Sequence, residues 1–443
     1  MKTLRIGTGA GFAGDRIRPA VDLARNGALD YLVFECLAER TIALAQLDRL
    51  NDPAAGYDKR LDQRMRAVLP DCHRHGTRII TNMGAANPLE AARRTAEIAA
   101  ELGLKLRVAA VVGDDVLDRI GPCILDETGC PASDLGDRLV SANAYLGAEG
   151  IVKALARKAD IVICGRVADP SLFVAPMIHE FGWALDDHDL IGRGTVVGHL
   201  MECGAQVTGG YFADPGVKDV PNLATVGYPI AEVAEDGTAI ITKLAGTGGL
   251  VSRETCIEQL LYELHDPAQY FQPDVVANFS GVDFSEIGPD RVAVTGGTGA
   301  PATGRLKVSV GARDGWIGQG EISYAGPGAV ARARLAGEIT TERLGHIANQ
   351  IEDMRVDIIG LDAILPTDAF APEPRDVRLR IAARCTDTEV ARAVADEVEG
   401  LYLSGPAGGG GVATTVREVI GIRSTYLPAA EVSTCVHMFG EAG

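Results

Sequence analysis

The chain has 443 residues and a formal net charge of −18, with 60 acidic against 42 basic side chains. A surface this acidic repels phosphate backbones and anionic lipids, which argues against nucleic-acid or membrane binding. The sequence contains no apolar run long enough for a membrane span, and its first residues lack the pattern of a signal peptide. The nine cysteines follow no disulfide spacing. We therefore expect reduced thiols and a cytoplasmic protein.

The first half of the chain alternates short apolar runs with amphipathic runs. The apolar runs predict strands at 4–8, 30–36, 78–82, 106–112 and 160–164. The amphipathic runs predict helices at 19–26, 38–50, 58–73, 88–102 and 139–158. Such alternation favours parallel strands joined by helical crossovers. The predicted fold class is therefore α/β, with an N-terminal parallel βα-repeat sheet over residues 1–225.

The pattern changes in the second half, which we expect to form a mixed α+β domain over residues 226–443. Asp236-Gly237 between two apolar runs predicts a hairpin at 229–233 and 239–244. Further predicted strands are 291–295, 305–310 and 318–324, with helices from 253 to 265 and from 329 onwards. The segments 376–385, 389–399 and 400–403 predict a β-α-β unit.

A glycine-rich loop follows the first predicted strand. Its glycines have the spacing G-x-G-x-x-G: Gly9, Gly11 and Gly14. Glu35 ends the next strand about twenty residues later, as in a dinucleotide-binding fingerprint. Asp15 places a carboxylate where pyrophosphate charge would gather, and Pro19 indicates a late helix start. The alternative is a tight turn that lets the backbone pass close to another segment.

Two later loops also combine neighbouring glycines. They contain Gly248 and Gly249, and Gly408 and Gly409. Consecutive backbone N–H groups in such loops can bind a phosphate or carboxylate, although each loop is also compatible with a simple flexible turn. Cys72-His73-Arg74-His75 lacks a second ligand pair at zinc-finger spacing. We expect no metal and no resident cofactor.

Five polar residues, mostly near predicted strand ends, are candidate catalytic residues: Glu35, Asn82, Arg166, Asp169 and Glu202. Carboxyl groups at such positions suit acid–base chemistry, an amide suits oxyanion stabilisation, and an arginine fork suits a carboxylate or phosphate. Asp169 also precedes Pro170 and would equally suit a helix cap. His199 and Glu202 share one face of a helix.

These blocks together resemble the AtuA-like (acyclic terpene utilisation) family, formerly a domain of unknown function. The matching stretches are 9–16, 30–41, 81–88, 164–183, 199–210, 246–252 and 404–411. The resemblance implies a role in bacterial breakdown of acyclic terpenes such as citronellol and geraniol, which proceeds through acyl-CoA esters. Larger members carry an additional C-terminal ferredoxin-like domain of about one hundred residues. We expect this chain to lack that domain. The resemblance then points to a separate small ferredoxin-like subunit as a possible partner of this chain.

Three functions compete at this stage. The first is an enzyme that acts on an acyl-CoA or branched carboxylic acid by lyase or hydratase chemistry, with Glu35 and Asn82 as acid–base group and oxyanion donor. The second is an NAD(P)-dependent oxidoreductase, based on the first glycine loop. The third is a non-catalytic subunit that pairs with the small ferredoxin-like protein. We also expect a homo-oligomer.

Overall fold

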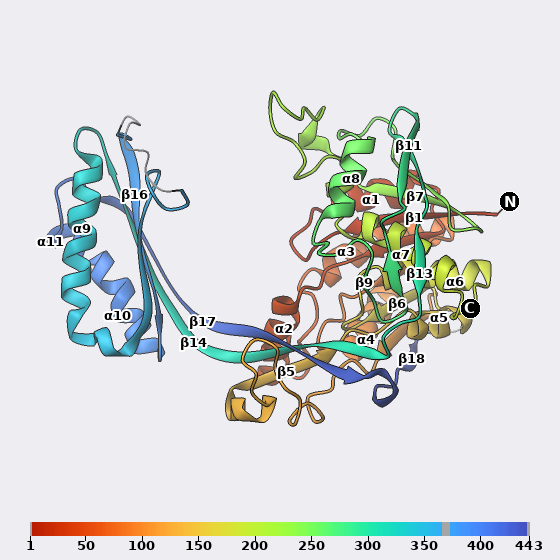
Figure 1. Cartoon of the computed structure of the whole chain (residues 1–443), viewed down its shortest axis with the longest axis horizontal. Helices are drawn as coiled ribbons and strands as arrows, with labels where there is room; N and C mark the ends of the chain where they lie inside the picture. Colours follow the sequence, from red (N-terminus) through yellow and green to blue (C-terminus); the bar gives the residue numbers. More distant parts are fainter. Residues whose placement is uncertain (1, 366–372, 441–443) are drawn as a thin grey trace. The chain divides into compact units, whose positions relative to one another are not determined.

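The computed structural model describes residues 2–365 and 373–440 (Figure 1). The chain forms two compact units, one from Met1–Gly311 with Ile422–Gly443 and one from Ala312–Gly421. The predicted boundary near residue 225 falls inside the first unit. The reason is that β7 (Pro229–Ala234), which follows that position, pairs with β1 (Thr3–Ala10) in the same sheet.

The first unit is built on a mixed sheet with the strand order β11-β12-β8-β7-β1-β2-β3-β6-β4-β18. Its central strands are β1, β2 (Tyr31–Phe34), β3 (Arg78–Thr81), β6 (Ile161–Cys164) and β4 (Val108–Val112). Each of these strands is parallel to its neighbour, which confirms the predicted parallel βα sheet. Their carboxyl ends therefore meet at one edge, where α/β proteins place their sites.

Antiparallel strands extend this sheet on both sides. They are β7, β8 (Ala239–Lys243), β12 (Arg291–Thr295) and β11 (Asp283–Gly288) on one side and β18 (Cys435–Phe439) on the other. The predicted hairpin is present, since β7 and β8 are antiparallel and Gly237 adopts a φ of +79° in the turn. A three-stranded sheet of β9 (Tyr270–Phe271), β10 (Val276–Asn278) and β13 (Thr298–Ala300) lies in the same unit.

Helices cover both faces of the sheet, which explains why its strands are continuously apolar. One apolar core contains α1 (Arg18–Asn26), α3 (Leu61–His75) and α4 (Pro88–Glu101). The other contains α5 (Glu149–Ala156), α6 (Ser171–Phe181), α7 (His188–Glu202) and α8 (Arg253–Leu261). Leu32 of β2 belongs to the first core, and Tyr31 and Val33 to the second, as alternation along a strand requires. Helix α2 (Glu39–Asn51) follows β2.

The predicted helix over 139–158 is wrong in its first part. Residues Leu139–Ala144 form strand β5, and α5 begins only at Glu149. Strand β5 pairs with β14 (Arg305–Ala325), which lies far away in the sequence. A partner this distant overrides the local helical pattern.

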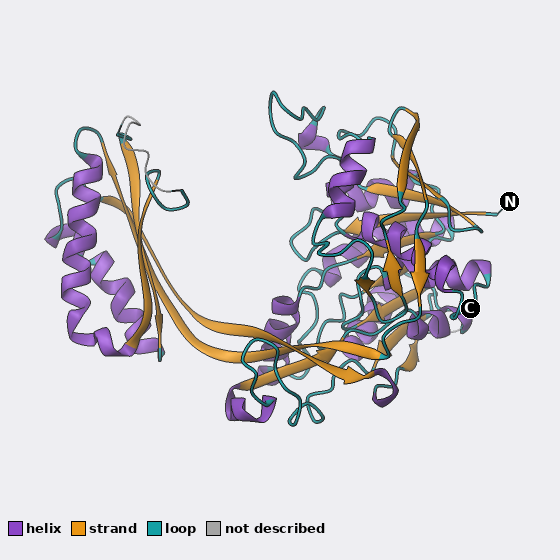
Figure 2. Ribbon diagram, in the orientation of Figure 1, coloured by secondary structure: helices purple, strands orange, loops and turns teal. Residues whose placement is uncertain are grey.

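The second unit contains a sheet with the order β15-β16-β14-β17, where β15 is Ile351–Ile359, β16 Asp376–Cys385 and β17 Gly410–Pro428. Helices α9 (Ala329–Leu344) and α10 (Thr388–Glu399) share an apolar core with it, and Figure 2 shows both along one side of the strands.

Two predictions for the chain from 305 onwards need correction. The strands expected at 305–310 and 318–324 are parts of the single strand β14. Two strands were expected because Gly315, which has a φ of +82°, resembles a turn residue between them. The strand expected at 400–403 is instead the short helix α11 (Leu401–Ser404), whose Leu401 is buried against α10 and the sheet.

Short 3-10 turns complete the description: η1 (Ala132–Arg138), η2 (Gly204–Thr208), η3 (Leu223–Thr225), η4 (Gly345–Gln350) and η5 (Ala429–Glu431). Within residues 2–365 and 373–440, no helix has both the length and the apolar character needed to cross a membrane.

Candidate active site

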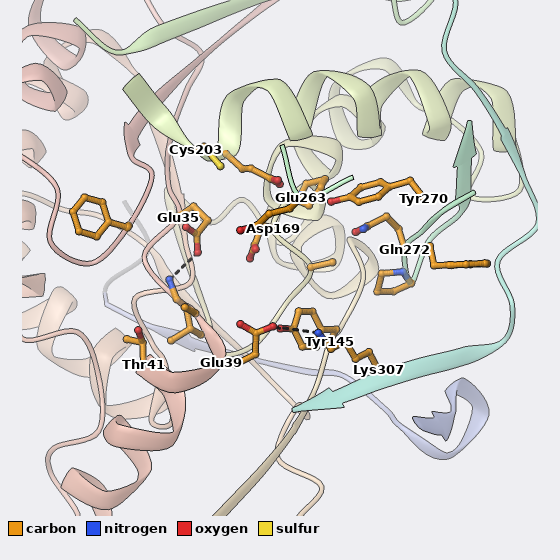
Figure 3. Close-up of a pocket in the computed structure, with 18 of the residues that line it drawn as sticks. Glu35, Glu39, Thr41, Tyr145, Asp169, Cys203, Glu263, Tyr270, Gln272 and Lys307 are labelled. Atoms are coloured by element: carbon orange, nitrogen blue, oxygen red, sulfur yellow. Dashed lines mark hydrogen bonds and ion pairs between the residues drawn. The ribbon is translucent and has the colours of Figure 1, made fainter. Parts of the chain in front are cut away.

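A pocket of about 700 Å³ lies in the first unit, at the carboxyl ends of β1, β2 and β6 (Figure 3). All residues that line it belong to this unit. Its wall carries five carboxyl groups: Glu35, Glu39, Asp169, Glu202 and Glu263. Glu35, Asp169 and Glu202 are sequence-predicted residues that the structure brings together at one pocket.

Glu35 directly follows β2 and is buried. Its Oε1 accepts hydrogen bonds from the Leu37 N–H at 2.7 Å and from Asn82 Nδ2 at 2.9 Å. Burial and the nearby Asp169 carboxylate raise the pKa of Glu35 well above its usual value, although Arg166 opposes them. The shift favours the protonated form of Glu35. Because two N–H donors occupy Oε1, the hydrogen of that form is on Oε2.

Asn82 does not line the pocket and is fully buried behind Glu35. Its Oδ1 accepts from the Cys36 N–H at 2.7 Å, and this contact fixes the orientation of the amide because a backbone N–H only donates. The amide nitrogen then faces Glu35. Asn82 thus contacts Glu35 and does not line the pocket, whereas the sequence suggested a donor to substrate.

Arg166 and Asp169 form an ion pair at the end of β6. The Arg166 guanidinium is buried and also donates to the carbonyl oxygens of Val167 and Leu37, and it lies 4.5 Å from the ring centroid of Tyr145. These contacts occupy the fork, so Arg166 orients Asp169 and does not face the pocket itself. Helix α6 has no side-chain cap, so Asp169 does not act as one. Burial raises the pKa of Asp169, and Arg166 opposes this rise.

Glu202 lies at the end of α7 and its Oε1 is 2.9 Å from His199 Nδ1. Its other oxygen, Oε2, is buried and has no hydrogen-bond partner in the described chain. Burial raises the pKa of Glu202 to about 7, although the neighbouring His199 lowers it. Cys203, the next residue, also lines the pocket, and burial together with Glu202 raises the pKa of its thiol. The thiol is therefore neutral and a poor nucleophile.

The opposite wall carries a charged group of different character. Tyr145 donates its hydroxyl hydrogen to Glu39, and Lys307 Nζ lies 3.2 Å from Glu39 Oε1 (Figure 3). Burial raises the pKa of Glu39, but the hydrogen bond from Tyr145 and the Lys307 charge outweigh it and lower the pKa to about 2. Glu39 is thus ionised, whereas the pKa of Glu35 is shifted towards its protonated form.

Several pocket residues carried no local signal in the sequence: Tyr145, Glu263, Tyr270, Arg305 and Lys307. They come from loops and from strands β9 and β14, which long-range pairing brings to the pocket. Arg305 lies with its guanidinium 5.1 Å from the ring centroid of Tyr426. Among the residues that the structure describes, it has no carboxylate partner.

The first glycine loop brings strand β1 close to the end of α7. A Cβ atom on Gly11 would lie only 2.4 Å from the Cys203 carbonyl carbon, and Gly9 and Gly14 similarly pack against aromatic rings. The Gly11 N–H donates to Asp15 Oδ2 at 2.9 Å. The loop's spacing is thus explained by close backbone packing, the alternative to a dinucleotide fingerprint.

The other glycine pairs are not among the residues that line the pocket. The N–H groups of Gly248 and Gly249 donate to the carbonyl oxygens of Thr225 and Pro221. Gly408 and Gly409 belong to the second unit. Anion binding by these four residues stays a prediction. In residues 2–365 and 373–440, no three His, Cys, Asp or Glu side chains are grouped so that they could hold a metal ion.

Parallel strands with carboxyl groups collected at their carboxyl ends define an α/β protein with a pocket at the usual position of ligand sites. The chain belongs to the acyclic terpene utilisation family. A family model described as "Acyclic terpene utilisation family protein AtuA" matches residues 4–438, which confirms the resemblance noted from the sequence. Membership implies involvement in acyclic terpene utilisation. Neither the curated proteins nor the solved structures give a significant match.

Proposed function

We propose that the protein is an enzyme of acyclic terpene and branched-chain acid catabolism that acts on an acyl-CoA or carboxylic acid by lyase- or hydratase-type acid–base chemistry. One observation carries the proposal. Glu35, Asp169 and Glu202 line one pocket, and each has one carboxyl oxygen bound to another protein group. The second oxygen of each has no such bond in the described chain, and that of Glu202 is buried. These three oxygens are the candidate contacts of a substrate.

The protonation states suit this chemistry. Adding water to an unsaturated acyl chain, or removing it, requires one group that donates a proton and one that accepts a proton. Burial raises the pKa of Glu35, which makes it the candidate proton donor. Asp169 and Glu202 are the candidate acceptors. Enzymes separate such roles by giving neighbouring carboxyl groups different surroundings.

The rest of the pocket suits a branched hydrocarbon with an anionic end. Phe12, Tyr262 and Phe271 contribute aromatic surface. Its volume of about 700 Å³ lies within the range typical of small-molecule sites. Arg305 and Lys307 lie on the same wall and would attract a carboxylate or a phosphate of coenzyme A.

The oxidoreductase alternative has weaker support. A dinucleotide fingerprint uses free N–H groups of the first loop, but Asp15 occupies that of Gly11. A small ferredoxin-like partner and a homo-oligomer stay predictions, since a single chain tests neither. They are compatible with the proposed enzyme and with a non-catalytic subunit.

The experiment incubates the purified protein in D₂O with CoA thioesters and free acids of saturated and unsaturated isoprenoid chains. NMR then follows deuterium at the carbon next to the carbonyl, and mass spectrometry follows gain or loss of water. We expect deuterium incorporation, a change in water content, or both, with at least one of these compounds. In E35Q the rate of that reaction should fall about 10²–10⁴-fold. Turnover that requires NAD or NADP would favour the oxidoreductase instead. No conversion of any member would contradict the proposal.

A further inference from the structure

His199 is buried on α7, one turn before Glu202, and both of its ring nitrogens have partners. Nε2 lies 3.1 Å from the backbone carbonyl oxygen of Leu260. A carbonyl oxygen only accepts hydrogen bonds, so Nε2 carries a hydrogen whether the imidazole is neutral or charged. Nδ1 is therefore the nitrogen that titrates, and it faces Glu202 Oε1 at 2.9 Å.

A single proton occupies the contact between His199 Nδ1 and Glu202 Oε1. Either a neutral imidazole accepts it from the Glu202 carboxyl group, or an imidazolium donates it to the carboxylate. In both arrangements Glu202 Oε2 has no hydrogen. That oxygen is buried and has no protein partner in the described chain.

We propose that His199 is a positioning residue that makes Glu202 the proton acceptor of the pocket, with Oε2 as the accepting atom. The inference rests on the proposed acid–base function and assigns its base. Glu35 has the opposite arrangement, since two N–H donors hold its Oε1 and the hydrogen of its protonated form is on Oε2. One carboxyl group thus presents a donor to the pocket and the other an acceptor.

The proton transfer balances without any further reactant. The bond between hydrogen and the carbon next to the substrate carbonyl breaks, and its electron pair stays on the substrate as an enolate. The proton forms a bond to Glu202 Oε2, and the proton at Oε1 resides fully on His199 Nδ1. The dyad gains one positive charge and the substrate one negative charge, so the imidazolium helps to stabilise the enolate. The reverse step returns the proton.

Neighbouring side chains confine the His199 imidazole of this dyad. The Tyr270 hydroxyl lies 3.4 Å from His199 Nδ1, and the Tyr270 and Phe279 rings flank the imidazole with centroids 5.2 Å and 5.6 Å away. Gln259 from α8 donates to the His199 carbonyl oxygen at 2.9 Å.

The carboxylates around the dyad raise the pKa of both His199 and Glu202. Burial lowers the pKa of His199, but Glu202, the Leu260 carbonyl and Glu263 together raise it above its ordinary value. Asp169 and Glu263, on neighbouring segments, raise the pKa of Glu202. Cys203 and Tyr270, the other titratable groups at the dyad, stay neutral because burial raises their pKa.

Nitrogen NMR on the full chain labelled with ¹⁵N-histidine tests the assignment without a substrate. The His199 signals are identified by their loss in H199Q, and the wild type is followed from mildly acidic to mildly alkaline pH. We expect Nε2 to stay protonated throughout and Nδ1 alone to titrate. In E202Q the pKa of His199 should fall by about one unit or more, because the carboxylate that stabilises the imidazolium is gone. The matched control is E263Q, which removes a pocket carboxyl group that makes no hydrogen bond to His199 and should shift it less.

A neutral imidazole with its hydrogen on Nδ1, or an unchanged His199 pKa in E202Q, would overturn the inference. The position of the imidazole hydrogen and the His199 pKa are both measured on the folded protein without substrate. They therefore test the inference even if none of the thioesters and acids is converted. Where deuterium exchange is observed, H199Q should lower kcat about 10²-fold with little change in KM, as loss of a base predicts. An unchanged kcat in a folded H199Q would also overturn it.

Discussion

The side-chain amide of Asn82 donates to Glu35 Oε1 at 2.9 Å from the strand next to the one that carries the acid. The same amide accepts from the Cys36 N–H at 2.7 Å, so one buried residue fixes both the carboxyl group and the backbone beside it. A carboxyl group held in one position is what the proposed role of Glu35 as a general acid requires.

Replacing Asn82 should change the pH profile as well as stability. In N82A, Glu35 loses a hydrogen bond that favours its ionised form, so its pKa rises further. An acid loses activity as pH rises through its pKa, and the alkaline limb of the exchange rate should therefore move to higher pH. The unpaired Cys36 N–H should cost about 1–3 kcal/mol of unfolding free energy. As a control, N87A removes a buried amide that bonds Pro53 and Ala55, and it should leave the limb in place.

Buried Asp114 predicts a distinct pH dependence of stability. Burial raises its pKa from 3.8 to about 6, opposed by hydrogen bonds from the Arg166 N–H and Asn143. The native state binds this proton more tightly than the unfolded state, so the stabilisation is complete below pH 3.8 and is lost as pH rises through about 6. Denaturant unfolding should show the wild type losing about 3 kcal/mol relative to D114N over this interval. Parallel curves for the two proteins would contradict the prediction.

Gly11 should tolerate no side chain. An added Cβ would lie 2.4 Å from the Cys203 carbonyl carbon and 2.7 Å from the Gly204 nitrogen, both backbone atoms. G11A should therefore cost about 1–3 kcal/mol and move the end of α7, with a parallel loss of activity. Thermal unfolding measures the loss of stability. G121A is the matched control, because no atom lies within 4 Å of its Cβ position, and its unfolding should change by about 0.5 kcal/mol or less.

Arg305 should contribute to binding and not to the chemical step. In R305M the stacking on Tyr426 is partly kept, but the charge that attracts an anionic substrate end is lost. We expect KM to rise about tenfold with kcat nearly unchanged, which steady-state kinetics measures. R18M removes a charge on α1, which pairs with Asp22 and does not line the pocket, and it should leave KM unchanged. A fall in kcat in R305M would place Arg305 in the chemistry instead.

The central sheet could be predicted because its strands are short, buried on both faces and separated by amphipathic helices. Strand β5 was missed because its partner, β14, is distant in the sequence. The interruption at Gly315 was misleading for a similar reason. It resembles a turn locally, but pairing with β16 begins at Trp316 and keeps the strand continuous.

The candidate site divides along the same line. Glu35, Asp169 and Glu202 could be found because they lie at the ends of predictable strands or helices. Tyr145 and Lys307 could not, since only folding brings their segments to the pocket. Local sequence patterns also could not predict which group binds each carboxyl group. The exception is the pair His199 and Glu202, which are one helical turn apart.

The order of strands has a consequence for synthesis on the ribosome. Strand β18 pairs with the edge of β4, and β17 delivers Tyr426 to the pocket. Strand β18 and Tyr426, near the end of β17, both follow the contiguous segment Ala312–Gly421 in the chain. During synthesis the outer edge of β4 in the first unit therefore stays uncovered until the second unit has emerged. We expect nascent chains that stop before residue 422 to depend on chaperones, although most of their sheet is already translated.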